Sequence, residues 1–152
     1  MSDSLVPHGF GYVGAALLST VFLLLGQTQV VSSKRRKSGI AYPQMYADKA
    51  QEKESKDALI FNCAQRAHQN TLEYIPAVYV TTIIAGLQYP VISASVCAGW
   101  VVSRIFYTRG YITGDPKKRV SVVYGLASVG LLGNLFLSTY IAGGWVMQNL
   151  KL

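Results

Sequence analysis

The sequence predicts an all-α membrane protein that forms a single domain, residues 1–152, with four transmembrane helices in a bundle. Hydrophobic residues make up 51% of the 152 positions and charged residues only 14%, against about 25% charged residues in soluble domains. Long runs without Asp, Glu, Lys or Arg alternate with short basic loops, as is typical of membrane-spanning chains. The net charge of +7 lies mostly in those loops rather than over one face, which argues against nucleic acid as a partner.

The four expected spans follow from the charge-free runs. Phe10 to Val31 contains no charged residue and gives the first span. Residues 74–103 are also uncharged, but they are too long for one span. Tyr89-Pro90 divides them, because proline cannot continue the hydrogen-bond ladder of a helix. The expected spans are residues 10–33, 59–87, 91–111 and 117–148, with a polar segment at 34–58.

The basic residues predict how the spans are oriented. Eleven lie in two loops that four spans place on the same side: Lys34, Arg35, Arg36, Lys37, Lys49, Lys53 and Lys56 in one, and Arg109, Lys117, Lys118 and Arg119 in the other. The tails and the remaining loop contain one, Lys151. The positive-inside rule therefore predicts cytoplasmic basic loops and both termini on the other side of the membrane. The two cysteines, Cys63 and Cys97, lack metal-ligand spacing, so we expect two buried thiols and no metal site.

The segment from Phe61 to Pro76 is polar although it leads directly into the apolar part of the second span. A charged side chain near the middle of a bilayer costs about 2.5–3.5 kcal/mol. Arg66 and Glu73 would carry no such cost on a soluble surface helix, but they would incur it in a membrane helix. Their presence therefore favours a binding site. The alternative is an intramembrane ion pair that only clamps helices together.

Helical spacing divides this segment into two faces. Arg66, Asn70, Glu73 and Tyr74 fall on one stripe, which combines a cation, an amide, a carboxylate and a phenol. Such a stripe suits a zwitterionic ligand, because a carboxylate binds an ammonium and an arginine binds a carboxylate bidentately. His68 lies about 200° around the helix from Arg66. It can contact the same ligand only if the site is shared across an interface.

The third span ends in a second polar stripe, formed by Arg104, Tyr107 and Tyr111 at positions i, i+3 and i+7. One interpretation is an interfacial belt, since tyrosine favours the headgroup level. The other is a pocket, because this end of the span reaches the same depth as Arg66 and Asn70. Three polar features at one depth favour the pocket.

The turn after the third span brings basic residues to the start of the fourth. Gly114-Asp115-Pro116 predicts a tight turn, and Pro116 suits the first turn of the next helix. That arrangement places Lys118 and Arg119 in the first turn of the fourth span, near the membrane interface. The alternative for this basic cluster is a topology anchor, and the same alternative applies to Arg35 and Arg36.

Two motifs resemble a known family. FNCAQRAHQNTLEYIP and RIFYTRGYITGDPKKR, in a four-span chain of this length, are similar to the membrane-associated eicosanoid and glutathione metabolism (MAPEG) family. The resemblance covers nearly the whole chain. It implies a homotrimer of four-helix subunits in the endoplasmic reticulum membrane, with both termini on the luminal side. It also implies that glutathione, the co-substrate, binds between subunits in a site open to the cytoplasm.

The resemblance implies a role for individual residues. Within one subunit, glutathione would be bound by Arg66, Asn70, Glu73 and Tyr74, with further hydrogen bonds from Tyr107 and Tyr111. The neighbouring subunit would contribute Arg35 and His68. The catalytic arginine of the family lies at the start of the fourth helix near the glutathione sulfur, which points here to Arg119 with Lys118 as competitor. Arg36 would be a second catalytic arginine, near the lipid substrate.

The implied activity is that of a glutathione transferase and peroxidase. The glutathione thiolate would attack a lipophilic electrophile or reduce a lipid hydroperoxide, either of which can reach the site from membrane lipid. Two alternatives stay open. One is a non-enzymatic protein of the same fold that binds a lipid and presents it to a partner. The other is a structural four-span scaffold.

Overall fold

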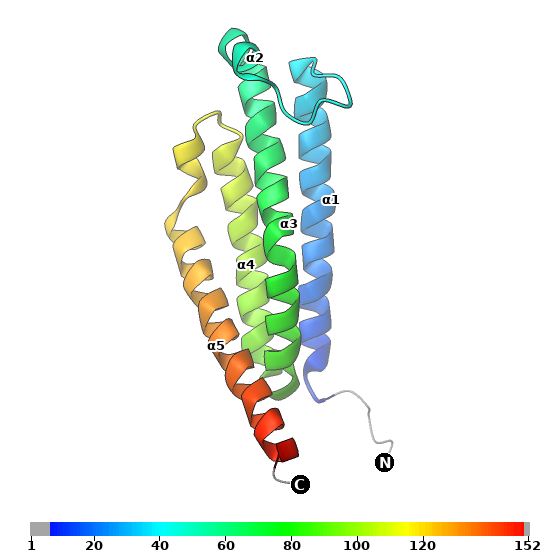
Figure 1. Cartoon of the computed structure of the whole chain (residues 1–152), viewed down its shortest axis with the longest axis vertical. Coiled ribbons are helices and arrows are strands. Elements are labelled where there is room, and N and C mark those ends of the chain that lie inside the picture. The colour runs from blue at the N-terminus through cyan, green and yellow to red at the C-terminus, as the bar shows by residue number, and fades with distance from the viewer. Residues whose placement is uncertain (1–6, 151–152) are drawn as a thin grey trace.

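The chain is almost entirely helical in the computed structural model, which describes residues 7–150 (Figure 1). The elements in order are α1 (Phe10–Ser38), α2 (Lys49–Glu54), α3 (Lys56–Gln88), α4 (Pro90–Tyr111), the 3₁₀ helix η1 (Pro116–Arg119) and α5 (Val122–Leu150). The long helices α1, α3, α4 and α5 lie side by side and alternate in direction. The all-α architecture is therefore confirmed.

Membrane-spanning character is clearest in three of the long helices. Within residues 7–150, α1, α4 and α5 are long and apolar enough to cross a membrane. The fourth long helix, α3, contains the polar segment of residues 61–76 and does not meet that test. The structure thus supports an integral membrane protein, and a fourth span in α3 stays a prediction.

Both basic loops lie at one end of the bundle. The connection between α1 and α2 and the turn that contains η1 are together at the top of Figure 1, whereas the turn between α3 and α4 lies at the bottom. This common placement is what the distribution of basic residues predicts. The chain ends assigned to the luminal side include residues 1–6 and 151–152, which lie outside the described residues.

The polar segment between the first two long helices is shorter than expected and partly helical. Helix α1 ends at Ser38 rather than residue 33 and is capped by Gly39, whose φ of +70° is a left-handed conformation that glycine adopts without strain. Helix α2 begins with a capping box, in which the Asp48 carboxylate accepts from the Gln51 backbone and the Gln51 side chain accepts from the Asp48 backbone. The extended backbone of Ser55 separates α2 from α3.

The predicted break between the second and third helices is confirmed. Helix α3 ends at Gln88 and α4 begins at Pro90, where a proline removes no intrahelical hydrogen bond because the first-turn N–H groups have no partner. Pro76, in contrast, lies inside α3, which continues through it.

The start of the last helix differs from the expected one. Pro116 does not open a helix over residues 117–148; it opens η1, and α5 begins only at Val122. The Asp115 carboxylate accepts a hydrogen bond from the Lys117 backbone and caps η1. Lys118 and Arg119 therefore lie in a separate helical turn before α5, and their expected place in the first turn of the last long helix is wrong.

The core lies between α1, α3 and α4. One buried apolar cluster comprises Val13, Ala16, Leu23, Val78, Ala94, Cys97, Trp100 and Val101. A second, near the basic end, comprises Val31, Ile40, Ala47, Ala58, Phe61 and Ala64. Both cysteines are buried free thiols, as expected.

Helix α5 packs against α3 and α4 through few buried residues. Among its described residues only Asn134, Ser138 and Ile141 are buried. The Asn134 amide donates to the Ser93 hydroxyl of α4 over 3.3 Å, and that hydroxyl donates to the Thr82 carbonyl of α3. Most of the apolar surface of α5 stays exposed, which suits a helix that faces lipid or another protein.

Candidate functional site

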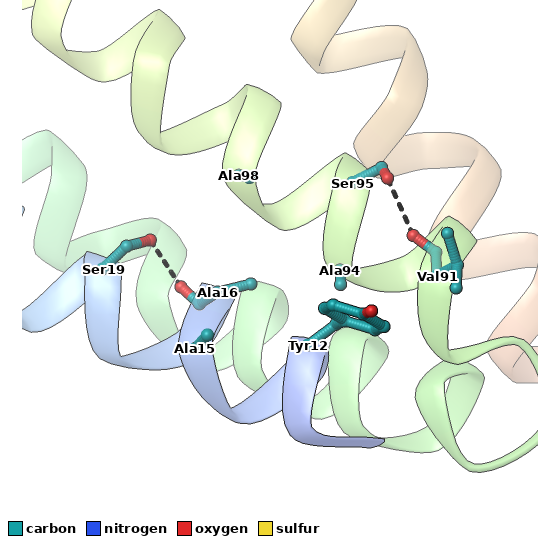
Figure 2. Close-up of a pocket in the computed structure, with 8 residues that line it drawn as sticks. All are labelled: Tyr12, Ala15, Ala16, Ser19, Val91, Ala94, Ser95 and Ala98. Atoms are coloured by element: carbon teal, nitrogen blue, oxygen red, sulfur yellow. Dashed lines mark hydrogen bonds between the residues drawn. The ribbon is translucent and has the colours of Figure 1, made fainter. Parts of the chain in front are cut away.

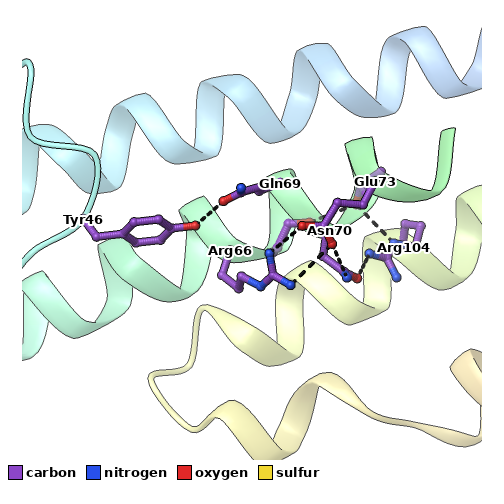
Figure 3. A network of polar contacts seen from close by, with 8 residues as sticks. Tyr46, Arg66, Gln69, Asn70, Glu73 and Arg104 are labelled. Atoms are coloured by element: carbon purple, nitrogen blue, oxygen red, sulfur yellow. Dashed lines mark hydrogen bonds and ion pairs between the residues drawn. The ribbon is translucent and has the colours of Figure 1, made fainter. Parts of the chain in front are cut away.

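The polar stripe of α3 contains an ion pair. Arg66 Nη1 lies 2.8 Å from Glu73 Oε1, and Arg66 Nη2 donates to Glu73 Oε2 over 3.3 Å (Figure 3). The two side chains are 43% and 46% exposed, so the pair lies at the surface of the isolated subunit. Both residues belong to α3, and therefore the pair itself does not clamp two helices together.

Asn70 connects this ion pair to α4. Its Nδ2 donates to Glu73 Oε2 over 3.2 Å, and its Oδ1 accepts from Arg104 Nη2 over 2.5 Å. The amide orientation follows from these two neighbours, because a carboxylate only accepts and a guanidinium only donates. Arg66, Asn70 and Glu73 therefore lie together as the helical spacing predicts, with Arg104 added from α4.

Arg104 is the most buried charged residue of the site, with 1% of its surface exposed. Its Nε donates to Thr71 Oγ1 over 3.1 Å, and its Cζ lies 4.2 Å from the centre of the Tyr107 ring and 5.6 Å from that of Tyr74. The sequence places Arg104 on a stripe with Tyr107 but does not identify it as a binding residue. Its charge in an otherwise apolar span was the signal that could have identified it.

A buried polar layer lies behind Arg104. Gln27 Nε2 donates to the hydroxyls of Thr71 and Thr108, over 3.0 and 2.8 Å. Thr71 Oγ1 thus accepts from both Gln27 and Arg104 and donates to the Ala67 carbonyl. This layer joins α1, α3 and α4 at the level of the site and fixes the position of Arg104. Sequence reasoning missed it, because no local pattern connects residues so far apart in the chain.

Aromatic rings continue the contacts from Arg104 to η1. The Tyr107 and Tyr111 rings pack edge to face with their centres 5.6 Å apart, and Tyr107 also packs on Tyr124 of α5 at 5.5 Å. Arg119 Cζ lies 5.4 Å from the centre of the Tyr111 ring. Tyr107 is therefore buried against Arg104 and two tyrosine rings, and Tyr111 lines a cavity next to η1.

The position of Arg119 depends on a close backbone approach. A Cβ on Gly110 would lie 2.0 Å from the carbonyl oxygen of Lys118 and 3.3 Å from the Arg119 nitrogen. Glycine is therefore required where η1 packs on the end of α4. The guanidinium of Arg119 donates to the Pro116 carbonyl, whereas the Lys118 side chain is exposed. Arg119, rather than Lys118, therefore packs against a residue of the site, Tyr111.

Tyr46 closes the basic end of the site from the loop before α2. Its hydroxyl donates to Gln69 Oε1, and burial raises the pKa of its phenol above the ordinary value. A cavity of about 250 Å³ is lined by Tyr46, Arg66 and Tyr111 together with residues of α2, α3 and η1. Tyr46 was not predicted as a site residue.

A second cavity, of about 310 Å³, lies between α3, α4 and α5. Tyr74, Arg104 and Tyr124 form its polar wall, whereas Leu131 and Leu135 belong to its apolar lining. A polar wall next to apolar side chains is typical of a site for an amphipathic molecule.

The remaining predicted residues lie elsewhere. Arg35 is 7% exposed, and its Nη1 donates to the Gln44 carbonyl over 2.7 Å. Its guanidinium thus contacts the loop of its own chain, and the expected contribution to a neighbouring site is not visible in one subunit. Arg36 is exposed near the end of α1, and His68 is partly buried on α3. The structure of one subunit does not bring Arg36 or His68 to the stripe.

A comparison with protein families agrees with the two sequence motifs. A family model described as the MAPEG family matches residues 13–140. The matched range contains α1, α3, α4 and η1 almost completely, and with them every residue of the site described above. The resemblance predicted from the motifs is confirmed.

Proposed function

The chain belongs to the MAPEG family, and from this we propose that it is a glutathione-dependent transferase and peroxidase of the membrane. In this proposal glutathione binds along the polar stripe of α3, and Arg119 stabilises its thiolate. The motif pattern is similar to that of the type 3 microsomal glutathione S-transferases within the family. That similarity favours the endoplasmic reticulum as the location, with both basic loops in the cytoplasm.

The observation that carries the proposal is one continuous series of contacts across three elements. It begins at Glu73 and Asn70 on α3, passes through Arg104 and Tyr107 on α4, and reaches Arg119 on η1 through Tyr111. A carboxylate for an ammonium group and a cation for a thiolate are thus held in one framework. A tripeptide with charged ends and a central thiol matches such a framework.

Arg119 supplies the chemistry that activation requires. A thiol with a pKa of about 8.5 is roughly 3% thiolate at pH 7. Lowering that pKa by about two units makes the thiolate the major form and requires about 2.7 kcal/mol of differential stabilisation. A guanidinium achieves this by charge and hydrogen bonding, and it stays protonated where a buried lysine would lose its proton. The thiolate then attacks the electrophile, or reduces the lipid hydroperoxide.

The binding residues divide between two subunits in this proposal. Arg66, Asn70, Glu73 and Tyr74 bind the charged ends and backbone of glutathione, and Tyr107 and Tyr111 add hydrogen bonds. His68 and Arg35 serve the adjacent subunit of a homotrimer, which requires the Arg35 guanidinium to exchange its loop contacts. The half-exposed state of the Arg66–Glu73 pair supports a site that a neighbouring subunit completes.

The second substrate approaches from the bilayer. The cavity between α3, α4 and α5 includes Tyr74 of the glutathione stripe in its polar wall and has an apolar lining towards α5. A lipophilic electrophile or lipid hydroperoxide in that cavity would not need to leave the membrane before it reacts. Arg36, at the end of α1, does not line this cavity, and we assign it to the lipid substrate from the family resemblance.

Glu73→Gln is expected to weaken glutathione binding about tenfold, because the neutral amide no longer pairs with the ligand ammonium. Isothermal titration of the purified protein with glutathione measures the change. Glu54→Gln, at an exposed position of α2, serves as a control that removes the same charge away from the stripe. Unchanged affinity in Glu73→Gln would favour the scaffold, in which the ion pair is only structural.

Arg104→Met is expected to leave the melting temperature nearly unchanged while it raises the dissociation constant for glutathione about tenfold or more. The apolar replacement removes the cost of burying a charge, but Asn70 loses a hydrogen bond to a charged donor, worth about 1.5–3 kcal/mol. Thermal unfolding tests the expected melting temperature, and glutathione titration of the same preparation tests the expected dissociation constant. A large fall in melting temperature with normal affinity would mean that Arg104 is only structural.

The activity itself is tested by turnover of the purified protein. Glutathione is supplied with one conjugation electrophile in one assay and one fatty-acid hydroperoxide in another. Conjugate or lipid alcohol should form only with glutathione present. Glutathione binding without either product would support a non-enzymatic lipid-binding protein, and no binding would support the scaffold.

A further inference from the structure

A long groove runs between α1 and α4 and belongs to no part of the proposed glutathione site. Its lower part, with a volume of about 500 Å³, is lined by Tyr12, Ala15 and Ser19 of α1 and by Ser95 and Ala98 of α4 (Figure 2). Its upper part, of about 580 Å³, also contains Ser19 and continues towards the basic end. We call the two parts together the α1–α4 groove.

The α1–α4 groove has the dimensions and surface of an acyl-chain site. From Tyr12 to Val30 it follows α1 for about 27 Å at 1.5 Å per residue, close to the roughly 30 Å of a hydrocarbon core. The Ser19 hydroxyl donates to the Ala16 carbonyl and the Ser95 hydroxyl to the Val91 carbonyl, over 2.6 and 2.8 Å. Both serines thus satisfy their hydroxyls on their own helix, and the lower part offers an apolar surface.

The upper part is polar at one level. Gln27, only 3% exposed, belongs to its lining, and both N–H groups of its amide are used by Thr71 and Thr108. Its Oε1 is buried and has no hydrogen-bond partner among the described residues. A buried carbonyl oxygen without a donor is costly. Because Gln27 lines the upper part of the groove, a small shift of its side chain would bring this oxygen to a ligand hydroxyl, which would make the hydrogen bond that the protein leaves unmade.

A cation lies next to this acceptor. Arg109 belongs to the same lining, is exposed in the last turn of α4, and follows Thr108, which bonds Gln27. It is therefore at the basic end of the bundle, where the headgroups of the cytoplasmic leaflet lie in the proposed orientation. An anionic headgroup is the complement of a guanidinium at that level.

The same geometry argues against a second copy of the chain in the groove. The proposed trimer uses the Arg66 face of α3 for the glutathione site of its own subunit and the His68 face for that of the adjacent subunit. No residue of α3 lines the groove, and Arg35, the residue of α1 that the proposed trimer gives to the adjacent subunit, is not part of its lining, so we infer that the groove faces the bilayer. Gly26 adds space, since a Cβ there would meet no atom within 4 Å.

We propose that the α1–α4 groove binds one monoacyl glycerophosphate from the surrounding membrane. The phosphate lies against Arg109, the free glycerol hydroxyl donates to Gln27 Oε1, and the acyl chain follows the groove towards Tyr12. The groove accommodates one acyl chain because it follows a single pair of helices. A diacyl phosphatidate lacks the hydroxyl, and a phosphatidylcholine lacks the net negative charge.

The test uses the full-length protein in phosphatidylcholine nanodiscs that contain oleoyl lysophosphatidate, with bound lipid counted by native mass spectrometry. We expect one lysophosphatidate per protomer. Gly26→Leu should remove it by filling the upper part, and Arg109→Gln should weaken it about fivefold, the effect of one basic residue near a headgroup. Gly133→Leu, at an open glycine of α5, and Lys37→Gln, at an exposed lysine of α1, should bind lipid normally.

A second substitution that fills the groove keeps the test valid if Gly26→Leu misfolds. Helix content is measured by circular dichroism, and Ala98→Phe fills the lower part should Gly26→Leu lose helix. Full occupancy by lysophosphatidate in folded Gly26→Leu or Ala98→Phe protein would show that the α1–α4 groove is not the binding site. Equal binding of oleoyl lysophosphatidylcholine would overturn the anionic headgroup, and equal binding of diacyl phosphatidate would overturn the single chain and its hydroxyl. Glutathione affinity is not a readout here, so the two proposals fail separately.

Discussion

Arg119→Ala is expected to abolish thiolate formation while glutathione still binds. Without the guanidinium the thiol returns to a pKa of about 8.5, so its ionised fraction at pH 7 falls from about three quarters to about 3%. The binding stripe on α3 is untouched, and the dissociation constant for glutathione should change little. The thiolate is measured by its ultraviolet absorbance when glutathione is added, and binding by isothermal titration of the same protein.

Lys118→Ala is the matched control, because it removes a cation from the neighbouring residue. The Lys118 side chain is exposed, whereas Arg119 packs against Tyr111, so this control should keep its thiolate signal. Loss of the signal in Lys118→Ala, together with a normal signal in Arg119→Ala, would assign activation to the lysine. Arg119→Lys should retain only part of the signal, since an ammonium does not reproduce the planar guanidinium fork.

Gly110→Ala is expected to reduce thiolate formation almost as strongly as loss of Arg119 itself, although it changes no charge. The added Cβ would lie 2.0 Å from the Lys118 carbonyl oxygen and 2.7 Å from its carbon. Backbone atoms cannot rotate away as a side chain can, so η1 must move as a unit and carry Arg119 with it. A misplacement of about 1 Å can cost on the order of 100-fold in rate. Thiolate absorbance and turnover measure the effect.

Gly125→Ala provides the comparison for this substitution. Gly125 lies in α5, where an added Cβ meets no atom within 4 Å, and alanine is about 1 kcal/mol better than glycine inside a helix. This variant should be fully active and slightly more stable. Normal thiolate absorbance in Gly110→Ala would show that the position of η1 does not determine activation.

Local sequence signals predicted the framework of the protein well. Pro90 ends one helix and begins the next because of its own geometry, and the stripe from Arg66 to Glu73 follows from helical spacing alone. The two motifs were sufficient to identify the family. These features depend on residues within a few turns of one another, which is the range over which periodicity and turn chemistry act.

Contacts between distant residues account for what the sequence did not predict. Arg104 bonds Asn70 across two helices, and Gln27 bonds Thr71 and Thr108 across three, so no spacing within one helix reveals them. The expected helix start at Pro116 failed for a similar reason. The approach of Lys118 to the Gly110 backbone holds η1 against α4 and separates it from α5, and such a tertiary contact overrides the local preference for a continuous helix.

The pairing of Arg66 with Glu73 has a consequence for which molecules the stripe accepts. In the empty subunit each charge is the counter-ion of the other. A ligand with an ammonium and a carboxylate side by side can exchange partners with both residues, and the number of ion pairs does not fall. A ligand with only one of these charges must leave Arg66 or Glu73 without its counter-ion. In the proposed function the stripe would thus select amino-acid-like ends by charge exchange, and would disfavour simple anions and simple amines without any steric barrier.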